Sequence, residues 1–245
     1  MPLTRIWDVI LVAGSCGSLY IFINYIFRVI TFIEVGNVLL LGVYTSIRVL
    51  VLILIGSIIW VPIGVWIGRR PNIAMVAQPI IQFLASFPAY LLFPLVITII
   101  IKYSLNVEIW SSPLMMLGSQ WYILFNIIAG TMALPKDLHY ATNLMGLSGF
   151  KWWKRFMLPG IFPYYVTGAI TAAGGAWNAS IVAEWVEWGD TTLVASGLGS
   201  YIAENTLTGE FERIALGTGV MCIFVLLLNK ICWLPLYRLA QSRMQ

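Results

Sequence analysis

Long apolar runs dominate the chain and recur along most of its length. A bilayer core about 30 Å thick needs roughly 20 helical residues to cross. Only helices or closed barrels can cross it, because backbone polar groups find no water inside. A barrel would show short alternating strands, whereas these runs are long and continuous. The pattern predicts an all-α membrane protein with six transmembrane helices, at residues 8–32, 40–67, 73–101, 113–134, 163–187 and 213–236.

The third predicted span differs from the others because it contains Pro79, Pro88 and Pro94. Proline lacks a backbone N–H and clashes with the preceding turn, so it kinks or breaks a helix. We expect this span to be kinked, or to be split into a short leading segment and a span.

Positive charge gathers on one side of the predicted spans. That side holds Arg5, Arg69, Arg70, Lys136, Lys151, Lys154, Arg155, Arg238 and Arg243, whereas the other side holds Arg28, Lys102 and Arg213. Cytoplasmic loops of membrane proteins are enriched in Lys and Arg. Because an even number of spans puts both termini on one side, the bias predicts cytoplasmic termini and a cytoplasmic loop at residues 135–162.

Composition excludes several classes of protein. Of the 245 residues, 60% are apolar and 10% are charged, against about 45–50% and about 25% in soluble domains. A soluble enzyme, a disordered chain and a disulfide-stapled secreted module are therefore excluded. The net charge of +4 reflects basic cytoplasmic loops rather than affinity for nucleic acid. The chain also has no GxxxxGK[ST] phosphate-binding motif, metal-ligand cluster or Ser-His-Asp grouping, so it offers no catalytic chemistry and no cofactor of its own.

The cytoplasmic loop at 135–162 holds two short amphipathic pieces, at residues 137–145 and 149–157. Asp137 is a plausible N-cap of the first piece, and Pro159 is expected to end the second. Gly146 lies between them, and we expect it to turn the chain with a positive φ. The loop is too short for a domain with its own core. It therefore predicts a small helical projection that docks onto a soluble partner.

This loop resembles the coupling motif of binding-protein-dependent ABC importer permeases: Glu-Ala-Ala, three residues, Gly, nine residues, Ile, one residue, Leu-Pro. The matching positions here are Tyr140, Ala141, Thr142, Gly146, Phe156, Leu158 and Pro159. Tyr140, Thr142 and Phe156 depart from the motif, and the loss of the Glu leaves one polar contact to the ATPase open. Residues 173–185, 197–211 and 228–240 are similar to permeases of the nitrate, sulfonate, taurine and bicarbonate group, closest to the C-terminal half of a duplicated anion permease.

The resemblance implies a type I importer-like fold with a single permease domain over residues 1–245. It implies half of a pore for a small anion in a bacterial-type inner membrane. The implied partners are an ABC ATPase dimer that carries ATP and Mg²⁺, a second permease subunit (identical or paralogous), an extracytoplasmic substrate-binding protein and membrane lipid. The chain itself would be a transport subunit and not an enzyme.

Four residues of the predicted spans are candidates for the translocation pathway: Arg48, Trp177, Asn178 and Glu184. Polar side chains in hydrocarbon are costly and usually face a cavity or a partner. Trp177 with Asn178 resembles a narrow place in the pore of the family. Glu184 would repel an anion, so it could instead pair with Arg48 or lie at headgroup level. Arg48 could contact an anion or form that internal salt bridge.

Small residues of the fifth span, spaced three and four apart, predict close helix packing, either inside the bundle or against a second subunit. They are Gly168, Ala169, Ala172, Ala173, Gly174, Gly175 and Ala176. The alternative function is an ion-driven secondary transporter or a channel. Such a protein needs no coupling projection and should show interrupted spans with ionisable residues in both halves. The third span fits that description, and no matching span is found in the second half.

Overall fold

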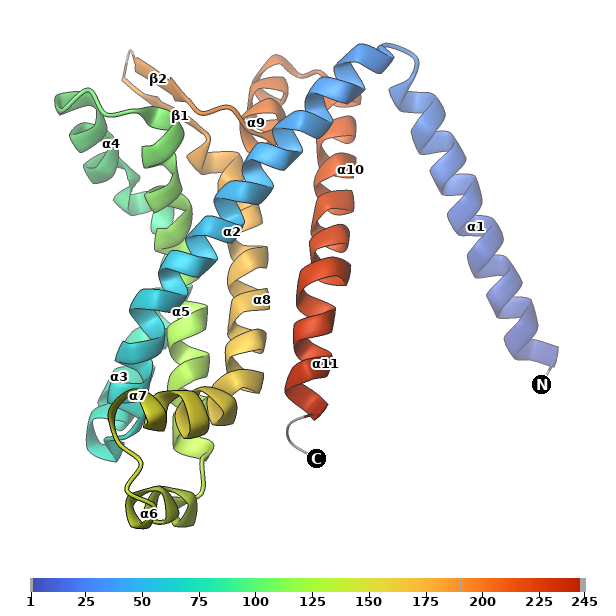
Figure 1. The fold of residues 1–245 in the computed structure, drawn as a ribbon. Helices are drawn as coiled ribbons and strands as arrows, with labels where there is room; N and C mark the ends of the chain where they lie inside the picture. The colour runs from blue at the N-terminus through green and yellow to red at the C-terminus, as the bar shows by residue number, and fades with distance from the viewer. Residues whose placement is uncertain (1, 190, 243–245) are drawn as a thin grey trace.

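The computed structural model describes residues 2–189 and 191–242 as a helical bundle with a small hairpin at one end (Figure 1). Its first half contains α1 (Pro2–Ile26), α2 (Phe32–Gly68), α3 (Pro71–Ser86), the 3₁₀ turn η1 (Ala89–Leu92), α4 (Phe93–Lys102) and α5 (Val107–Ala133). Its second half contains α6 (Lys136–Leu144), α7 (Gly149–Trp152), the π-helical turn η2 (Trp153–Met157), α8 (Leu158–Ala183), β1 (Trp185–Trp188), β2 (Thr191–Val194), α9 (Leu198–Thr208), α10 (Phe211–Leu228), the π-helical turn η3 (Asn229–Trp233) and α11 (Leu234–Ser242).

Four helical segments are long and apolar enough to cross a membrane: Phe32–Gly68, Val107–Ala133, Gly149–Ala183 and Phe211–Ala240. Their positions along the chain confirm the predicted spans at 40–67, 113–134, 163–187 and 213–236. The third span is split, as the prolines indicated, because α3 and the segment Ala89–Lys102 meet at a bend of 84°. The predicted span at 8–32 corresponds to α1, in which the described residues Ile10–Ile26 form an apolar helix shorter than a span. The described residues therefore hold four spans, or five with the bent pair, and the count of six is not fully confirmed.

The core of the bundle is α5, which packs against α8 on one side and α2 on the other. Glycine permits these close approaches. A Cβ on Gly168 of α8 would lie 2.9 Å from the carbonyl oxygen of Tyr122, and one on Gly64 of α2 would lie 2.6 Å from Ile127. Small residues let membrane helices pack closely, so the prediction of close packing for the fifth span is confirmed at Gly168. Helix α1 lies apart from the bundle, and its main contact is with α10 (Figure 1).

Two boundaries differ from the sequence prediction. The fifth span was expected to reach residue 187, but α8 ends at Ala183 and residues 185–188 form β1. Val186 pairs with Leu193 of β2, and Trp185 pairs with Val194. A short run of alternating, β-favouring residues at the end of an apolar helix thus forms a hairpin rather than a last helical turn.

The second boundary concerns the coupling loop. Pro159 was expected to end its second piece, yet the helix runs without interruption from Gly149 to Ala183. The π-helical turn η2 precedes Pro159, which falls in the first turn of α8. A π-turn changes the local hydrogen-bond pattern, and the missing N–H of a proline is tolerated at the start of a helix. Asp137 is likewise not the N-cap of α6, because Pro135 occupies that position and Asp137 lies in the first turn.

Most basic residues lie at one end of the bundle and most acidic residues at the other, where Arg48 and Arg213 pair with carboxylates. The end that carries α6 and α7 also holds the beginning of α1 and the end of α11, together with Arg69, Arg70 and the lysines of the coupling loop (Figure 1). The opposite end holds the hairpin and α9, with the acidic residues Glu34, Glu108 and Glu204. This arrangement agrees with the loop assignment made from the sequence.

Candidate functional site: the coupling loop and one face of α8

Helix α6 lies beyond the ends of the spans, and α7 crosses the base of the bundle beside it (Figure 1). Large apolar side chains on this projection face outward: Leu144 is 89% exposed and Phe150 is 78% exposed. Thr142 is buried and Ala141 is half-buried, so this side of α6 faces the protein. Tyr140, at the position of the missing Glu, is exposed. Exposed apolar side chains at the polar end of a membrane protein are typical of a protein-binding surface.

Gly146 ends α6 with φ of +62°, which confirms the predicted positive φ. The N–H of Gly146 donates to the carbonyl of Asn143 at 3.0 Å, and the N–H of Leu147 donates to that of Thr142 at 3.0 Å. These two bonds form a Schellman motif, which satisfies the last carbonyls of a helix and requires a left-handed residue. No atom lies within 4 Å of a Cβ built on Gly146. The requirement for glycine is therefore conformational rather than steric.

Aromatic contacts hold α6 against the second piece of the loop. The ring of His139 meets that of Phe156 edge to face at 4.9 Å, and Phe156 also lies 5.8 Å from the ring of Trp152. Burial, with the nearby charge of Arg69, lowers the pKa of His139. The imidazole is therefore neutral at pH 7 and packs as an aromatic ring. Across residues 2–189 and 191–242, no three His, Cys, Asp or Glu side chains are grouped to hold a metal ion.

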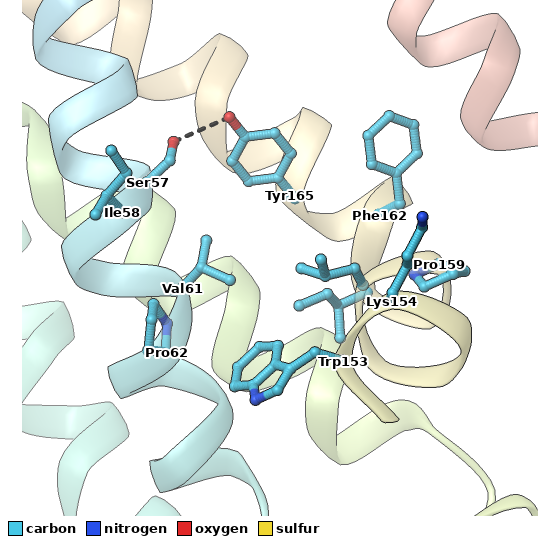
Figure 2. Close-up of a pocket in the computed structure, with 11 residues that line it drawn as sticks. Ser57, Ile58, Val61, Pro62, Trp153, Lys154, Pro159, Phe162 and Tyr165 are labelled. Atoms are coloured by element: carbon cyan, nitrogen blue, oxygen red, sulfur yellow. Dashed lines mark hydrogen bonds between the residues drawn. The ribbon is translucent and has the colours of Figure 1, made fainter. Parts of the chain in front are cut away.

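Leu158 and Pro159 line a cavity of about 640 Å³ between α2 and the start of α8 (Figure 2). The cavity also touches Trp153 and Lys154, and at its far end the hydroxyls of Ser57 and Tyr165 are 2.9 Å apart in a hydrogen bond. Of the seven residues of the coupling motif, Tyr140, Ala141 and Thr142 thus lie in α6, Gly146 in the turn after it, Phe156 in η2, and Leu158 and Pro159 at the start of α8.

Glu184 and Arg48 form an ion pair at the opposite end of the bundle. This is the salt bridge that the sequence offered as one alternative for Arg48. Glu184 is fully buried and also accepts hydrogen bonds from Thr45 Oγ1 at 3.0 Å and from the N–H of Gly199 at 2.8 Å. Arg48 in turn contacts Glu108 Oε2 at 3.1 Å. A buried charge is tolerated when it is paired and hydrogen-bonded, and this carboxylate is both.

These ion pairs and hydrogen bonds, here called the Glu184 network, connect the hairpin and the start of α9 to the spans. A Cβ at Gly197 would overlap the Glu184 carboxylate, and one at Gly199 would overlap the Ser180 carbonyl and lie 2.8 Å from Glu184 Oε2. Glu108 accepts hydrogen bonds from the N–H of Ser196 at 2.9 Å and its hydroxyl at 2.7 Å. The network therefore joins α2, α5, the end of α8 and the start of α9.

One face of α8 is exposed and polar along most of its length. Its exposed residues are spaced three and four apart, which is one helical stripe: Tyr164, Thr167, Thr171, Gly174, Asn178 and Val182. The buried residues of the helix, among them Val166, Ala169, Ala173 and Ala176, lie on its other side. The hydroxyls of Thr167 and Thr171 donate to carbonyls four residues earlier, whereas the Asn178 amide has no hydrogen-bond partner among the described residues. By contrast, the exposed side chains in the middle of α2 are apolar, and they include Val51, Leu54 and Ile58.

Of the four pathway candidates, only Asn178 lies on this exposed face. Trp177 is 3% exposed and packs towards Phe224 of α10, with ring centroids 6.5 Å apart. Arg48 and Glu184 form an ion pair with each other away from this face. Sequence reasoning did not single out Thr167 and Thr171, although their spacing from Asn178 would have placed them on its side of the helix.

A family model of the binding-protein-dependent transport system inner membrane component matches residues 60–245. The chain belongs to this family. The match includes the coupling loop, α8 and everything after them, and it confirms the family resemblance of the loop. The chain is thus a transport component of an inner membrane, and the ion-driven alternative is not favoured.

Similar proteins include the bicarbonate transport system permease protein CmpB of Synechocystis sp., which is 26% identical over 176 residues, covering 72% of this chain and 60% of the relative. The nitrate import permease protein NrtB of Leptolyngbya laminosa is 26% identical over 186 residues, covering 74% of this chain and 62% of the relative. The chain therefore spans about 60% of the length of the curated relatives it matches.

The structure is similar to that of a chain from the MetNI methionine ABC transporter in an inward-facing conformation. The TM-score is 0.66 with 16% identity, over 88% of this chain and 100% of the other. A second inward-facing crystal form gives a TM-score of 0.63. These likenesses confirm the predicted type I importer-like fold.

Proposed function

We propose that this chain is the permease subunit of an ATP-driven ABC importer for a small anion, with residues 1–245 as a single transmembrane domain. The observation that carries the proposal is the projection formed by α6, Gly146 and α7 within the region that matches the family. A permease needs such a projection to receive motion from a soluble ATPase. A channel or ion-driven carrier has no use for it.

The ATPase dimer, with its ATP and Mg²⁺, docks on the outward side of this projection. Exposed Tyr140, Leu144 and Phe150 supply the apolar contact. Phe156 acts indirectly, because its ring holds His139 and so fixes the angle of α6. The end of the bundle that carries this loop and most of the basic residues is cytoplasmic, together with both termini.

The polar face of α8 lines the pathway together with that of a second permease subunit, identical or paralogous. Thr167, Thr171 and Asn178 are neutral, and the Asn178 amide can donate a hydrogen bond to an anion without trapping it, whereas the two threonine hydroxyls donate to the backbone. Glu184, the acidic residue nearest this helix end, is buried and paired with Arg48, so its charge does not oppose the anion. Bicarbonate and nitrate are the first candidate substrates, because the relatives named above carry those names. A substrate-binding protein delivers the anion at the end that carries the hairpin and α9.

The proposal is tested by co-purification and reconstitution. The tagged chain is co-expressed with a candidate ABC ATPase and binding protein, purified as a complex and placed in liposomes. We expect uptake of labelled bicarbonate or nitrate that requires both ATP and the binding protein. Matched liposomes without ATP, carrying a proton or sodium gradient, are the control. Uptake driven by the gradient alone would contradict the proposal.

Replacing Asn178 by leucine is expected to lower anion uptake by a factor of roughly 3–10, the value of one lost hydrogen bond. Assembly and basal ATP hydrolysis should remain near wild type, because the amide has no partner among the described residues that the change could disrupt. Asn229→Leu is the matched control, since Asn229 is an exposed asparagine of η3 away from this face. An equal loss of assembled complex and of uptake would assign Asn178 a structural role.

A further inference from the structure

Two cavities of the cytoplasmic half join into one groove along α2. The first is the cavity of Figure 2, which Ile58 and Val61 of α2 line on one side and Phe162 of α8 on the other, so its lining is largely apolar. The second has a volume of about 650 Å³ and lies between the end of α2 and the turn that leads into α7. Both are lined by Pro62 and Trp153, so one continues into the other. The groove therefore runs from an apolar section inside the span to a polar section at its cytoplasmic end.

The polar section carries two unpaired cations. The guanidinium of Arg69 lies 4.8 Å from the ring centroid of Trp152, and that of Arg70 lies 4.4 Å from that of Trp66. Arg70 also donates to the carbonyl of Trp66 at 2.9 Å. Neither arginine forms an ion pair with any residue that the structure describes. Cation–π contacts hold both groups in place and leave their charge free for an anion.

The charge of the lining is entirely positive. Lys154 lines the first section of the groove, Arg69 and Arg70 line the second, and Asn143 and Ser148 add neutral polar groups there. The residues that line the two cavities include no Asp or Glu. An anionic group is therefore attracted to this end without a competing repulsion.

The position of the groove relative to the membrane follows from α2. Arg69 and Arg70 come directly after this 37-residue apolar helix, where a span meets the headgroups. Trp66, Trp152 and Trp153 surround them, and tryptophans are enriched at that depth. The basic section thus lies at headgroup level, and the apolar section lies at the depth of the acyl chains.

We propose that this groove binds an anionic phospholipid, with its phosphate between Arg69 and Arg70 and an acyl chain in the apolar section. A soluble anion would use the cations alone, and an apolar helix of a partner would leave the cations without counter-charge. A phospholipid with net negative charge matches both sections. The bound lipid would bridge α2 to the turn before α7, and so would steady the seat of the coupling loop.

The test is native mass spectrometry of the purified full-length chain in detergent, titrated with phosphatidylglycerol or with phosphatidylcholine of the same acyl chains. We expect selective retention of phosphatidylglycerol. The double variant Arg69→Gln with Arg70→Gln should weaken phosphatidylglycerol binding about 30-fold, which is the attraction that two cations contribute towards an anionic lipid. The control pair, Lys230→Gln with Arg238→Gln, removes the same charge from the same end but outside the groove and should leave binding unchanged. Equal retention of the two lipids, or unchanged binding by the Arg69 and Arg70 variant, would overturn the proposal.

Two further arms separate a lipid from a soluble phosphate and guard against misfolding. Val61→Trp fills the apolar section and should weaken phosphatidylglycerol binding severalfold while both arginines remain. Glycerol 3-phosphate, the headgroup without its chains, should bind far more weakly than the lipid, and equal affinity would overturn the lipid assignment. Arg69→Lys with Arg70→Lys keeps the charge and should retain the preference for phosphatidylglycerol. Loss of that preference in a variant with a wild-type melting temperature would count against the proposal.

Discussion

Replacing Arg48 by leucine is expected to destabilise the protein by about 3–5 kcal/mol, the cost of leaving a buried charge without its partner. Glu184 is fully buried, and Arg48 is the cation that pairs with it. Without the guanidinium, the carboxylate keeps its bonds from Thr45 and Gly199 but loses its counter-charge. The purified variant should therefore unfold at a markedly lower temperature in detergent, as measured by intrinsic fluorescence. Proteolysis of the hairpin and α9 should rise with it, because the Glu184 network fastens them.

Two matched variants identify the cause. Glu108→Gln removes the other carboxylate that contacts Arg48, but Glu108 is half-exposed, so we expect a change within about 1 kcal/mol. Arg48→Leu combined with Glu184→Gln removes both charges and keeps an oxygen that can accept from Gly199. This double variant should regain much of the lost stability. A single Arg48→Leu variant that melts like wild type, or a double variant that is no better than the single one, would contradict the role of the pair.

Features that depend on local sequence were predicted well. Long apolar runs located four spans and the bent pair, and a glycine between two short amphipathic pieces specifies a left-handed turn without reference to the rest of the fold. The break in the third span was likewise visible in its prolines, although its 84° bend was not. The same local reasoning was wrong at Pro159, because a π-turn just before it lets the helix continue. It was also wrong at residues 185–188, where an apolar run pairs with a strand that follows it.

Features that depend on distant contacts could be predicted only as alternatives. The partners of Glu184 come from Thr45, Arg48 and Gly199, and no spacing along the chain brings them together. The sequence offered the Arg48 pair among several readings for that reason. The polar face of α8 was missed for a different cause. Its threonines and Gly174 are mixed with glycines and alanines that do pack inside the bundle, and only the packing of α8 on α2 and α5 separates the two sets.

Replacing Gly146 by valine is expected to abolish coupled transport while leaving the spans inserted. The Schellman turn needs φ near +62°, and a β-branched residue held there costs about 1–3 kcal/mol. The turn would relax to negative φ, the two bonds that close α6 would be lost, and α6 would point away from its seat. Because no apolar residue of the spans changes, insertion should be normal. The ATPase should then dissociate on purification, or hydrolyse ATP without uptake in liposomes.

Gly146→Asn is the matched control, because asparagine adopts the left-handed conformation far more readily than a β-branched residue. A Cβ at this position meets no atom within 4 Å, so neither variant is disturbed by a clash. Valine and asparagine therefore differ here chiefly in backbone preference, and asparagine should keep most of the bound ATPase and most of the uptake. The measurements are the amount of ATPase that co-purifies and the ratio of anion uptake to ATP hydrolysis. If the valine variant retained its ATPase and transported normally, the angle of α6 would not matter for coupling, and the main support for an ATP-driven permease would be lost.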